Sequence, residues 1–216
     1  GGAGLAGGSR PAAWATLRAA FGDARAYPAR YLAHSEGDAL GRMDAEAFAR
    51  AAQGNQLIMI AVSRESDIRE IIDLKKTMTN LQIVIVGAQE GWLAAEALAE
   101  ADIPVIIDPY NNLPGSFEQL GATQENAARL IEAGVQTAFA YFDDNSHQAR
   151  LILQSAGNAV GSGVDHTDAL QAITSVPADI FGVDGAGRLT TGSIGDVVIW
   201  DGDPLEVMSA PVRVFI

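Results

Sequence analysis

The fold is decided by the apolar run LIMIAV at residues 57–62, which contains no polar interruption. A short continuous run of this kind is typical of a strand that is buried on both faces, as in parallel sheets. Residues 66–78 follow it, and there Ile68, Ile71 and Ile72 recur at helical spacing. The stretch therefore predicts a buried strand that leads into an amphipathic helix.

The same cycle repeats further along the chain. Further buried strands are expected at 83–86, 105–107 and 135–141. The helices expected with them span 91–101, 124–133 and 147–157. Short buried strands that alternate with amphipathic helices indicate parallel βαβ units. Four such strands fit either half of an eight-stranded barrel or a small open sheet.

These patterns divide the chain into three parts. Residues 1–56 form a helix-and-loop segment, in which a helix begins at Pro11 and another spans 38–54. Residues 57–182 hold the four strands and their helices. Residues 183–216 change to a strand-turn-strand pattern, so they are interpreted as part of a small separate β unit. The strands expected in that unit are 196–200 and 212–216.

Composition excludes several classes of protein. The 216 residues include 27 acidic and 14 basic side chains, a formal net charge of −13, and no cysteine. The lack of cysteine excludes a disulfide scaffold, a thiol nucleophile and a cysteine metal cluster. The acidic balance disfavours nucleic acid and anionic membranes as partners, because both are bound by clustered lysine and arginine. With 48% hydrophobic residues, the chain can bury a sizeable core.

Hydropathy and the chain ends bear on location and completeness. No window approaches the roughly 18 consecutive apolar residues of a membrane span, and residues 1–8 lack the pattern of a signal peptide. The chain is therefore expected to be soluble, in a cytoplasm or a bacterial periplasm, since both suit a cysteine-free protein. It begins without Met and stops on the strand-like run 211–216, so we expect a piece of a longer protein.

An acidic pair follows the fourth expected strand. Asp143 and Asp144 come directly after it, and His147 lies three residues beyond Asp144. Carboxylates at the carboxyl ends of parallel strands serve as metal ligands and general bases, because the loops there converge on one pocket. Equally, Asp144 or Asn145 can cap the following helix. The spacing leaves these two interpretations about even.

Three more polar side chains are candidates at the same edge. Arg64, after the first strand, can bind an anionic group of a substrate, although pairing with Glu65, Asp67 or a neighbouring loop is commoner for such an arginine. Glu90, after the second strand, offers a carboxylate or is a first-turn residue that the helix dipole favours. Asn112 lies in a turn-rich loop after the third strand, which forms a pocket wall or a connector.

The histidines form no metal-binding motif. His34, His147 and His166 are far apart in the sequence, and no HxH or HExxH pair exists. A complete metal site made from this chain alone is therefore not expected. The sequence also lacks a GxSxG elbow, a phosphate loop and a dinucleotide fingerprint, so those chemistries are not predicted.

Several stretches match the pattern of one known family. They are residues 64–68, 86–92, 126–130 with 133–135, and 146–150. The most specific part is the tail, where 169–174 and 177–178 precede GSIGDVVIWDGDPL at 192–205. Together these stretches resemble the amidohydrolase superfamily, in the branch of imidazolonepropionase-like and related metal-dependent hydrolases. The resemblance covers most of residues 57–216.

The resemblance implies a metal-assisted hydrolase with a (β/α)8 barrel and a small β-sandwich. Family metal ligands are an HxH pair on the first strand, a lysine or carboxylate on the fourth, histidines on the fifth and sixth, and an aspartate on the eighth. The four expected strands correspond to the fifth to eighth. The eighth-strand aspartate then maps to Asp144, or to Asp143, and the two histidine positions fall on Ala61 and near Gln89. The first four strands are not in this sequence.

The fold hypothesis is an α/β chain that forms the C-terminal half of a (β/α)8 TIM-type barrel plus part of a small β-sandwich. Half a barrel leaves strand edges unpaired. We therefore expect a missing N-terminal half or a second chain, in a homo- or hetero-oligomer, to close it.

The function hypothesis is an amidohydrolase-like enzyme that acts on a carbon–nitrogen bond of a small amide, lactam or dipeptide-like substrate. Asp144 is the expected general base and metal contact, with His147 as a second catalytic residue. Arg64, Glu90 and Asn112 are the expected substrate-binding residues. A divalent metal, with zinc as first choice, is expected if the protein is active, and none if it is not.

The alternative is a non-catalytic barrel half that serves as a structural or ligand-binding subunit. The missing histidines at Ala61 and Gln89 favour this alternative.

Overall fold

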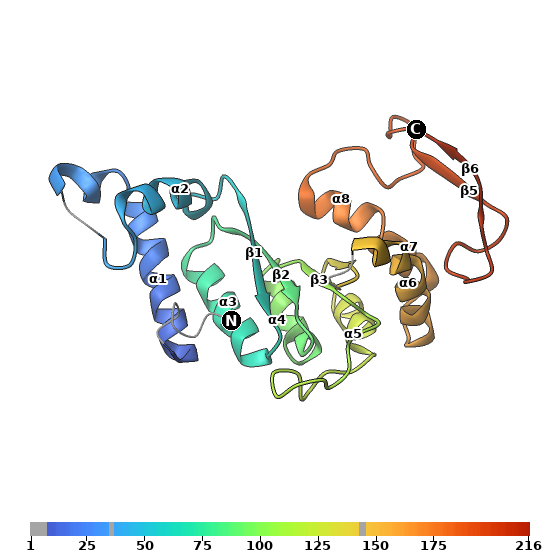
Figure 1. The fold of residues 1–216 in the computed structure, drawn as a ribbon, viewed down its shortest axis with the longest axis horizontal. Coiled ribbons are helices and arrows are strands. Elements are labelled where there is room, and N and C mark those ends of the chain that lie inside the picture. The colour runs from blue at the N-terminus through green and yellow to red at the C-terminus, as the bar shows by residue number, and fades with distance from the viewer. Residues whose placement is uncertain (1–7, 35–36, 143–145) are drawn as a thin grey trace. The chain divides into compact units, whose positions relative to one another are not determined.

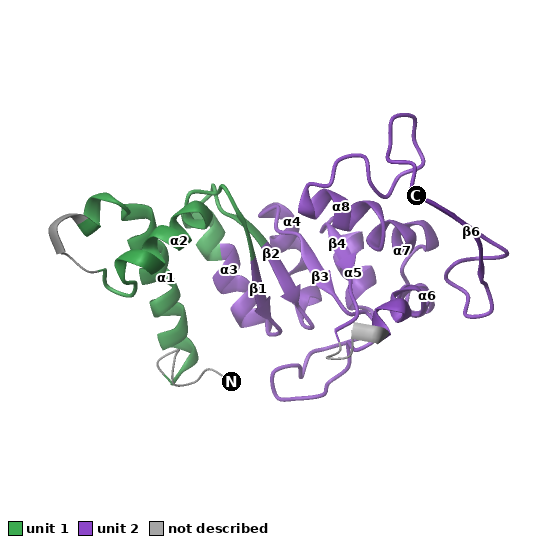
Figure 2. Ribbon diagram, turned by 45° about the horizontal axis from the view of Figure 1, so that its top comes forward, with its two compact units in different colours: residues 1–58, 73–83 green, residues 59–72, 84–216 purple. Residues whose placement is uncertain are grey.

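The chain forms two compact units in the computed structural model, which describes residues 8–34, 37–142 and 146–216. Unit 1 comprises residues 1–58 and 73–83, and unit 2 comprises residues 59–72 and 84–216 (Figure 2). Among the described residues, none of the helices combines the length and the apolar character needed to cross a membrane.

Unit 1 is built on two helices that pack against each other, α1 (Arg10–Ala26) and α2 (Arg42–Ala52). The short 3-10 helix η1 (Ala29–His34) lies between them in the sequence. Ser9 caps α1, because its side chain accepts the backbone N–H of Ala12. The rings of Phe21 and Phe48 join the two helices, with their centroids 4.7 Å apart. The helix expected to begin at Pro11 is thus present and starts one residue earlier.

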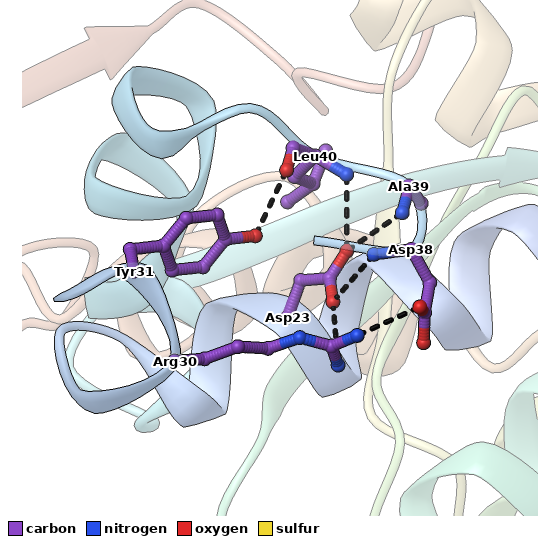
Figure 3. A network of polar contacts seen from close by, with 6 residues as sticks. All are labelled: Asp23, Arg30, Tyr31, Asp38, Ala39 and Leu40. Atoms are coloured by element: carbon purple, nitrogen blue, oxygen red, sulfur yellow. Dashed lines mark hydrogen bonds and ion pairs between the residues drawn. The ribbon is translucent and has the colours of Figure 1, made fainter. Parts of the chain in front are cut away.

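A buried carboxylate on α1 holds the loop that precedes α2 (Figure 3). Asp23 accepts the backbone N–H groups of Asp38, Ala39 and Leu40 at 3.1, 2.7 and 3.0 Å. The Nη1 atom of Arg30 lies 3.0 Å from the same carboxylate. Burial raises the pKa of Asp23, but the three N–H groups and Arg30 outweigh burial and hold the pKa below its ordinary value of 3.8.

Because of this network, α2 begins later in the chain than the sequence pattern predicts. The sequence pattern predicts a helix over 38–54, but α2 begins only at Arg42, because the N–H groups of residues 38–40 are directed to Asp23. Gly37 is required beside them, since a Cβ there would collide with the Tyr31 hydroxyl and the Asp23 carboxylate. The expectation for this boundary was therefore wrong by four residues, for a reason that lies in a distant side chain.

The parallel sheet that the sequence predicts is present. Its order is β1–β2–β3–β4, and the pairs β2/β3 and β3/β4 are parallel. The strands are β1 (Leu57–Val62), β2 (Gln82–Gly87), β3 (Val105–Ile107) and β4 (Thr137–Phe139). Every residue of β3 and β4 is buried, as expected for a parallel sheet, although β4 is not a continuous apolar run because it begins with Thr137. No residue of β1 is buried, so the expectation of burial on both faces was wrong for this strand, which lies at the edge of the sheet. In the described residues the sheet is open, with β1 and β4 at its edges, and no closed barrel is seen.

Helices connect successive strands, as expected for βαβ units (Figure 1). They are α3 (Glu65–Thr77), η2 (Gly91–Ala94) with α4 (Ala95–Glu100), and α5 (Asn126–Glu132). After β4 come η3 (Ser146–Leu151), α6 (Ile152–Gly161), α7 (His166–Ala172) and α8 (Ser175–Phe181). The side chains of Ile68, Ile71 and Ile72 on α3 are fully buried, so the periodicity that predicts this helix marks its core face.

The end of the chain forms a separate two-stranded antiparallel sheet, which confirms the expected change of pattern. Its strands are β5 (Val197–Trp200) and β6 (Pro211–Phe215). The loop between them packs on α6, where Leu205 is buried. His166, at the start of α7, places its Nε2 atom 2.7 Å from an Oδ2 atom of Asp203 in the same loop. The loop is thus fastened to the helices of unit 2 by one apolar and one polar contact.

Gly157 on α6 allows this close approach. A Cβ on Gly157 would collide with the carbonyl oxygen of Leu205, whereas a Cβ on Gly161 of the same helix would meet nothing within 4 Å. We therefore expect Gly157→Ala to displace the loop at a cost of about 1–3 kcal/mol, with faster hydrogen exchange at the amides of Asp203, Leu205 and Glu206. Gly161→Ala is the matched control and should be neutral or slightly stabilising. Equal exchange in the two variants would contradict the expectation.

Candidate active site

Polar residues gather at the carboxyl ends of the strands in unit 2, and most of them hold the long loop that follows β3. This loop runs from Asp108 to Glu125 and precedes α5. Its conformation depends on contacts with the residues that follow β1 and β2. We call it the β3–α5 loop.

Glu90, which follows β2, joins two backbone segments. One carboxylate oxygen accepts the backbone N–H of Glu65 at 3.0 Å, and the other accepts the N–H of Gly121 at 2.8 Å. Glu65 is the first residue of α3, and the N–H groups in the first turn of a helix have no partner within the helix. A carboxylate suits this position because it also interacts favourably with the helix dipole. Glu90 therefore connects the start of α3 to the β3–α5 loop.

Arg64, which follows β1, binds the same loop. Its guanidinium donates to the carbonyl oxygen of Phe117 and lies 3.1 Å from the carboxylate of Glu118. The sequence allows several roles for Arg64, and the structure shows the one in which it pairs with a neighbouring loop. Binding of an anionic substrate group by this arginine stays a prediction.

Asn112 is buried within the loop and binds one residue after β2 and one residue near the end of the loop. Its Nδ2 atom donates to the carbonyl oxygen of Gln89 at 3.3 Å and to that of Thr123 at 2.5 Å. The Oδ1 atom of Asn112 and the Oε1 atom of Gln89 are buried without a hydrogen-bond partner among the described residues. Arg64 and Glu90 thus contact the loop that contains Asn112, as the common position of the three residues after strands predicts.

Asp108 is not among the site residues predicted from the sequence, yet it connects the ends of two strands. Its carboxylate is buried and accepts four hydrogen bonds. One oxygen accepts the N–H groups of Tyr110 and Asn111 at 3.0 and 3.3 Å, and the other accepts the Asn111 side chain at 2.8 Å and the N–H of Phe142 at 3.1 Å. The available signal was an aspartate at a strand end before proline and asparagines, a pattern typical of a side chain that closes a turn.

A second connection that the sequence did not predict runs through α5. Asn126 is fully buried, accepts the N–H of Trp92 at 2.8 Å and donates to the carbonyl oxygen of Ala88 at 3.0 Å. The indole N–H of Trp92 donates to the carbonyl oxygen of Gly121 at 2.7 Å. Gly121 is therefore held through its N–H by Glu90 and through its carbonyl oxygen by Trp92.

Glu90→Gln tests how firmly the β3–α5 loop is held. Glutamine keeps the size of the side chain but turns one acceptor oxygen into an NH2 group, which then faces a backbone N–H. We expect a loss of about 1.5–3 kcal/mol in unfolding free energy and faster hydrogen exchange at the amides of Glu65 and Gly121. Glu96→Gln, on the exposed face of α4, is the control and should leave both unchanged. Unaltered exchange at Gly121 in Glu90→Gln would contradict the assignment.

The acidic pair lies outside the described residues. Asp143 and Asp144 fall in the gap between residues 142 and 146, and for His147 only the backbone of η3 is described. Their expected catalytic and metal-binding roles remain predictions from the sequence. Phe142, which directly precedes the pair, donates its N–H to Asp108.

The described residues do not by themselves fit the metal site that the resemblance implies. Across residues 8–34, 37–142 and 146–216, no three His, Asp or Glu side chains are placed to hold a metal ion. At the strand ends, both oxygens of Glu90 and both of Asp108 already accept N–H groups. The unpartnered oxygens there belong to the amides of Gln89 and Asn112, whereas zinc prefers histidine, cysteine and carboxylate ligands.

Comparison with solved structures shows a similar fold in two proteins that are described as hydrolases. An amidohydrolase from Thermotoga maritima MSB8 matches 96% of this chain with a TM-score of 0.81 and 23% sequence identity, and the match covers 55% of that protein. A metal-dependent hydrolase from Pyrococcus furiosus matches 76% of this chain, with a TM-score of 0.58 and 15% identity, over 36% of that protein. The chain thus spans about half of the first of these proteins and a smaller share of the second.

Sequence comparison gives the family. Amidohydrolase tasK of Hapsidospora irregularis is 36% identical over 78 residues, which is 35% of this chain and 8% of that protein. The model of the amidohydrolase family matches residues 35–214, which is most of the chain and includes all four strands of the parallel sheet. The chain therefore belongs to the amidohydrolase family.

Proposed function

We propose that the chain is the carboxyl-terminal half of a (β/α)8-barrel amidohydrolase that cleaves a carbon–nitrogen bond in a small amide, lactam or dipeptide-like substrate. The observation that carries this proposal is the match of 96% of the chain to only 55% of the Thermotoga maritima amidohydrolase. Strands β1 and β4, the edges of the open sheet, would then pair with strands of an amino-terminal half or of a second chain. Unpaired edges of a buried parallel sheet are otherwise a liability.

In this proposal Asp144 acts as the general base. It removes a proton from the attacking water and passes it to the leaving nitrogen, which is the usual task of a carboxylate at such a strand end. His147, in η3, is the second proposed catalytic residue. No step is assigned to a metal ion, because the described residues do not form its site.

The β3–α5 loop supplies a wall of the proposed substrate site. Arg64 and Glu90 hold this loop from the ends of β1 and β2, and Asn112 holds it from within. These three residues therefore contribute to substrate binding mainly by holding the loop in position. A rigid loop helps catalysis because the substrate is then held close to its reacting geometry.

A second candidate function is a non-catalytic barrel half that binds a ligand or supports another chain. Ala61 and Gln89 stand where the family resemblance expects histidines, and the carboxylates of Glu90 and Asp108 are engaged by N–H groups. These observations favour a member without the usual ligand set.

The test is an activity and metal assay on the full-length protein, including any amino-terminal half. We would load it with zinc, measure bound metal by mass spectrometry, and assay a panel of N-acyl amino acids, lactams and dipeptides. Turnover with a stoichiometric divalent ion is the expected result, and the 216-residue chain alone should be inactive. No turnover on the whole panel by metal-loaded protein would favour the non-catalytic candidate.

A further inference from the structure

A small pocket in unit 2 lies beside the carboxyl ends of β3 and β4. Its volume is about 290 Å³, and it is lined by Tyr110, Tyr141, Gln148, Leu151, Gln154 and Ser155. These residues come from the β3–α5 loop, from the end of β4, and from η3 and α6. None of them carries a charge at neutral pH, although the chain has a net charge of −13.

The lining residues define the chemistry of a ligand. The rings of Tyr110 and Tyr141 and the side chain of Leu151 offer apolar and aromatic contact. The Tyr141 hydroxyl donates to the Oε1 atom of Gln148 at 3.5 Å. The Gln148 NH2 group, the Gln154 carboxamide and the Ser155 hydroxyl offer hydrogen-bond donors and acceptors. Tyr110 and Gln154 are exposed at the mouth of the pocket, whereas Ser155 is buried. A charged group placed against Ser155 would lose hydration without meeting an opposite charge, which is costly. The pocket therefore suits a neutral group with a flat ring and a hydroxyl or amide.

The frame of the pocket is fixed by Asp108. This buried carboxylate accepts the N–H of Tyr110 at 3.0 Å and the N–H of Phe142, the residue after Tyr141, at 3.1 Å. The backbone of both tyrosine-bearing segments is thus anchored on one side chain. An anchored pocket needs little ordering when it binds, which favours affinity.

We propose that this pocket binds an uncharged aromatic substituent, bearing a hydroxyl or amide, of the substrate. The proposal rests on the proposed function, because Tyr141 and Gln148 lie in the sequence on either side of the segment that contains Asp144. A volume of about 290 Å³ is at the lower end of ligand sites, so the pocket holds one substituent and not a whole large ligand.

The experiment compares three probes that share a phenol ring, using isothermal titration calorimetry on the full-length protein. 4-Hydroxybenzamide is neutral, 4-hydroxybenzoate carries a carboxylate, and 4-hydroxybenzylamine carries an ammonium group, so each places its amide or charge beside the ring that enters the pocket. We expect the neutral probe to bind about tenfold more tightly than either charged probe, the effect of one unpaired charge or polar group. Equal affinity for all three, or no binding of the neutral probe, would overturn the proposal.

Matched variants locate the binding. Gln148→Glu puts a carboxylate into the pocket and should weaken the binding of 4-hydroxybenzamide about tenfold, with the circular dichroism spectrum unchanged. Gln171→Glu makes the same change on α7, in a different pocket near the amino ends of β3 and β4, and should have no effect. Should Gln148→Glu fail to fold, Gln154→Glu, which also lines the pocket, replaces it. Equal loss in Gln171→Glu would contradict the location.

The result is separable from the proposed function, because binding is measured without turnover. Binding of the neutral probe without hydrolysis of any panel substrate supports the pocket and contradicts the enzymatic proposal. Hydrolysis of panel substrates at rates that Gln148→Glu leaves unchanged, together with no probe binding, supports the enzyme and contradicts the pocket.

Discussion

Asp144→Asn is expected to lower the turnover of the full-length enzyme by about 10² to 10⁴-fold, the usual contribution of a general base. Asparagine keeps the shape of the side chain but cannot take a proton from water. The effect should appear in kcat, measured on whichever panel substrate gives turnover. The thermal midpoint of unfolding should change little, because asparagine has nearly the same volume as aspartate.

The neighbouring aspartate provides the control. Asp143→Asn makes the same chemical change one residue earlier, and Asp143 is the alternative match to the family aspartate. Turnover close to that of the unmodified enzyme is expected for this variant. If Asp143→Asn loses turnover while Asp144→Asn keeps it, the assignment of the base to Asp144 is wrong.

Three of the strands could be predicted because they consist of consecutive apolar residues, although no residue of β1, at the edge of the sheet, is buried. The expected ranges 57–62 and 105–107 coincide with β1 and β3, and 83–86 lies within β2. The range 135–141 is longer than β4 at both ends. Thr137 begins the paired region opposite Val105, and the Val135 N–H is used to close the turn after α5 by bonding to Leu130. Consecutive apolar residues therefore indicate a strand, while pairing sets the limits of the strand.

Side-chain contacts between distant residues could not be predicted in the same way. The start of α2 depends on Asp23, which binds N–H groups 15 to 17 residues further along. Arg64 similarly reaches the carbonyl oxygen of Phe117, 53 residues away. A local sequence pattern does not show which distant residue a side chain will bind, because many residues of the chain could serve as its partner.

The candidate site was likewise predictable only in part. The position of Arg64, Glu90 and Asn112 at one edge followed from the rule that loops after parallel strands emerge together. Their partners did not follow, nor did the central position of Asp108, because an aspartate in a turn-rich loop has the same sequence signal whether it binds a ligand or backbone N–H groups. The structure shows that Asp108 binds N–H groups from two strand ends.

Asp23→Asn is expected to destabilise unit 1 by about 3–5 kcal/mol, the usual cost of breaking a buried charge interaction. Both oxygens of Asp23 accept hydrogen bonds, so either orientation of an asparagine would point its NH2 group at backbone N–H donors. The measurements are urea unfolding by circular dichroism and hydrogen exchange at Ala39 and Leu40. Asp38→Asn is the control, because the Asp38 carboxylate binds the same Arg30 at 2.7 Å but is mostly exposed. It should cost less than about 1 kcal/mol.

The same substitution should remove part of the acid sensitivity of the protein. Because the folded-state pKa of Asp23 lies below its ordinary value of 3.8, the unfolded chain takes up the proton first as the pH falls. The stabilisation from this carboxylate is therefore complete well above pH 3.8, declines as the pH drops through that value, and is lost below the folded pKa. Unfolding free energies measured between neutral and acidic pH should fall less steeply for Asp23→Asn than for the unmodified protein. Parallel curves for the two proteins would show that Asp23 is not held ionised by its three N–H partners and Arg30.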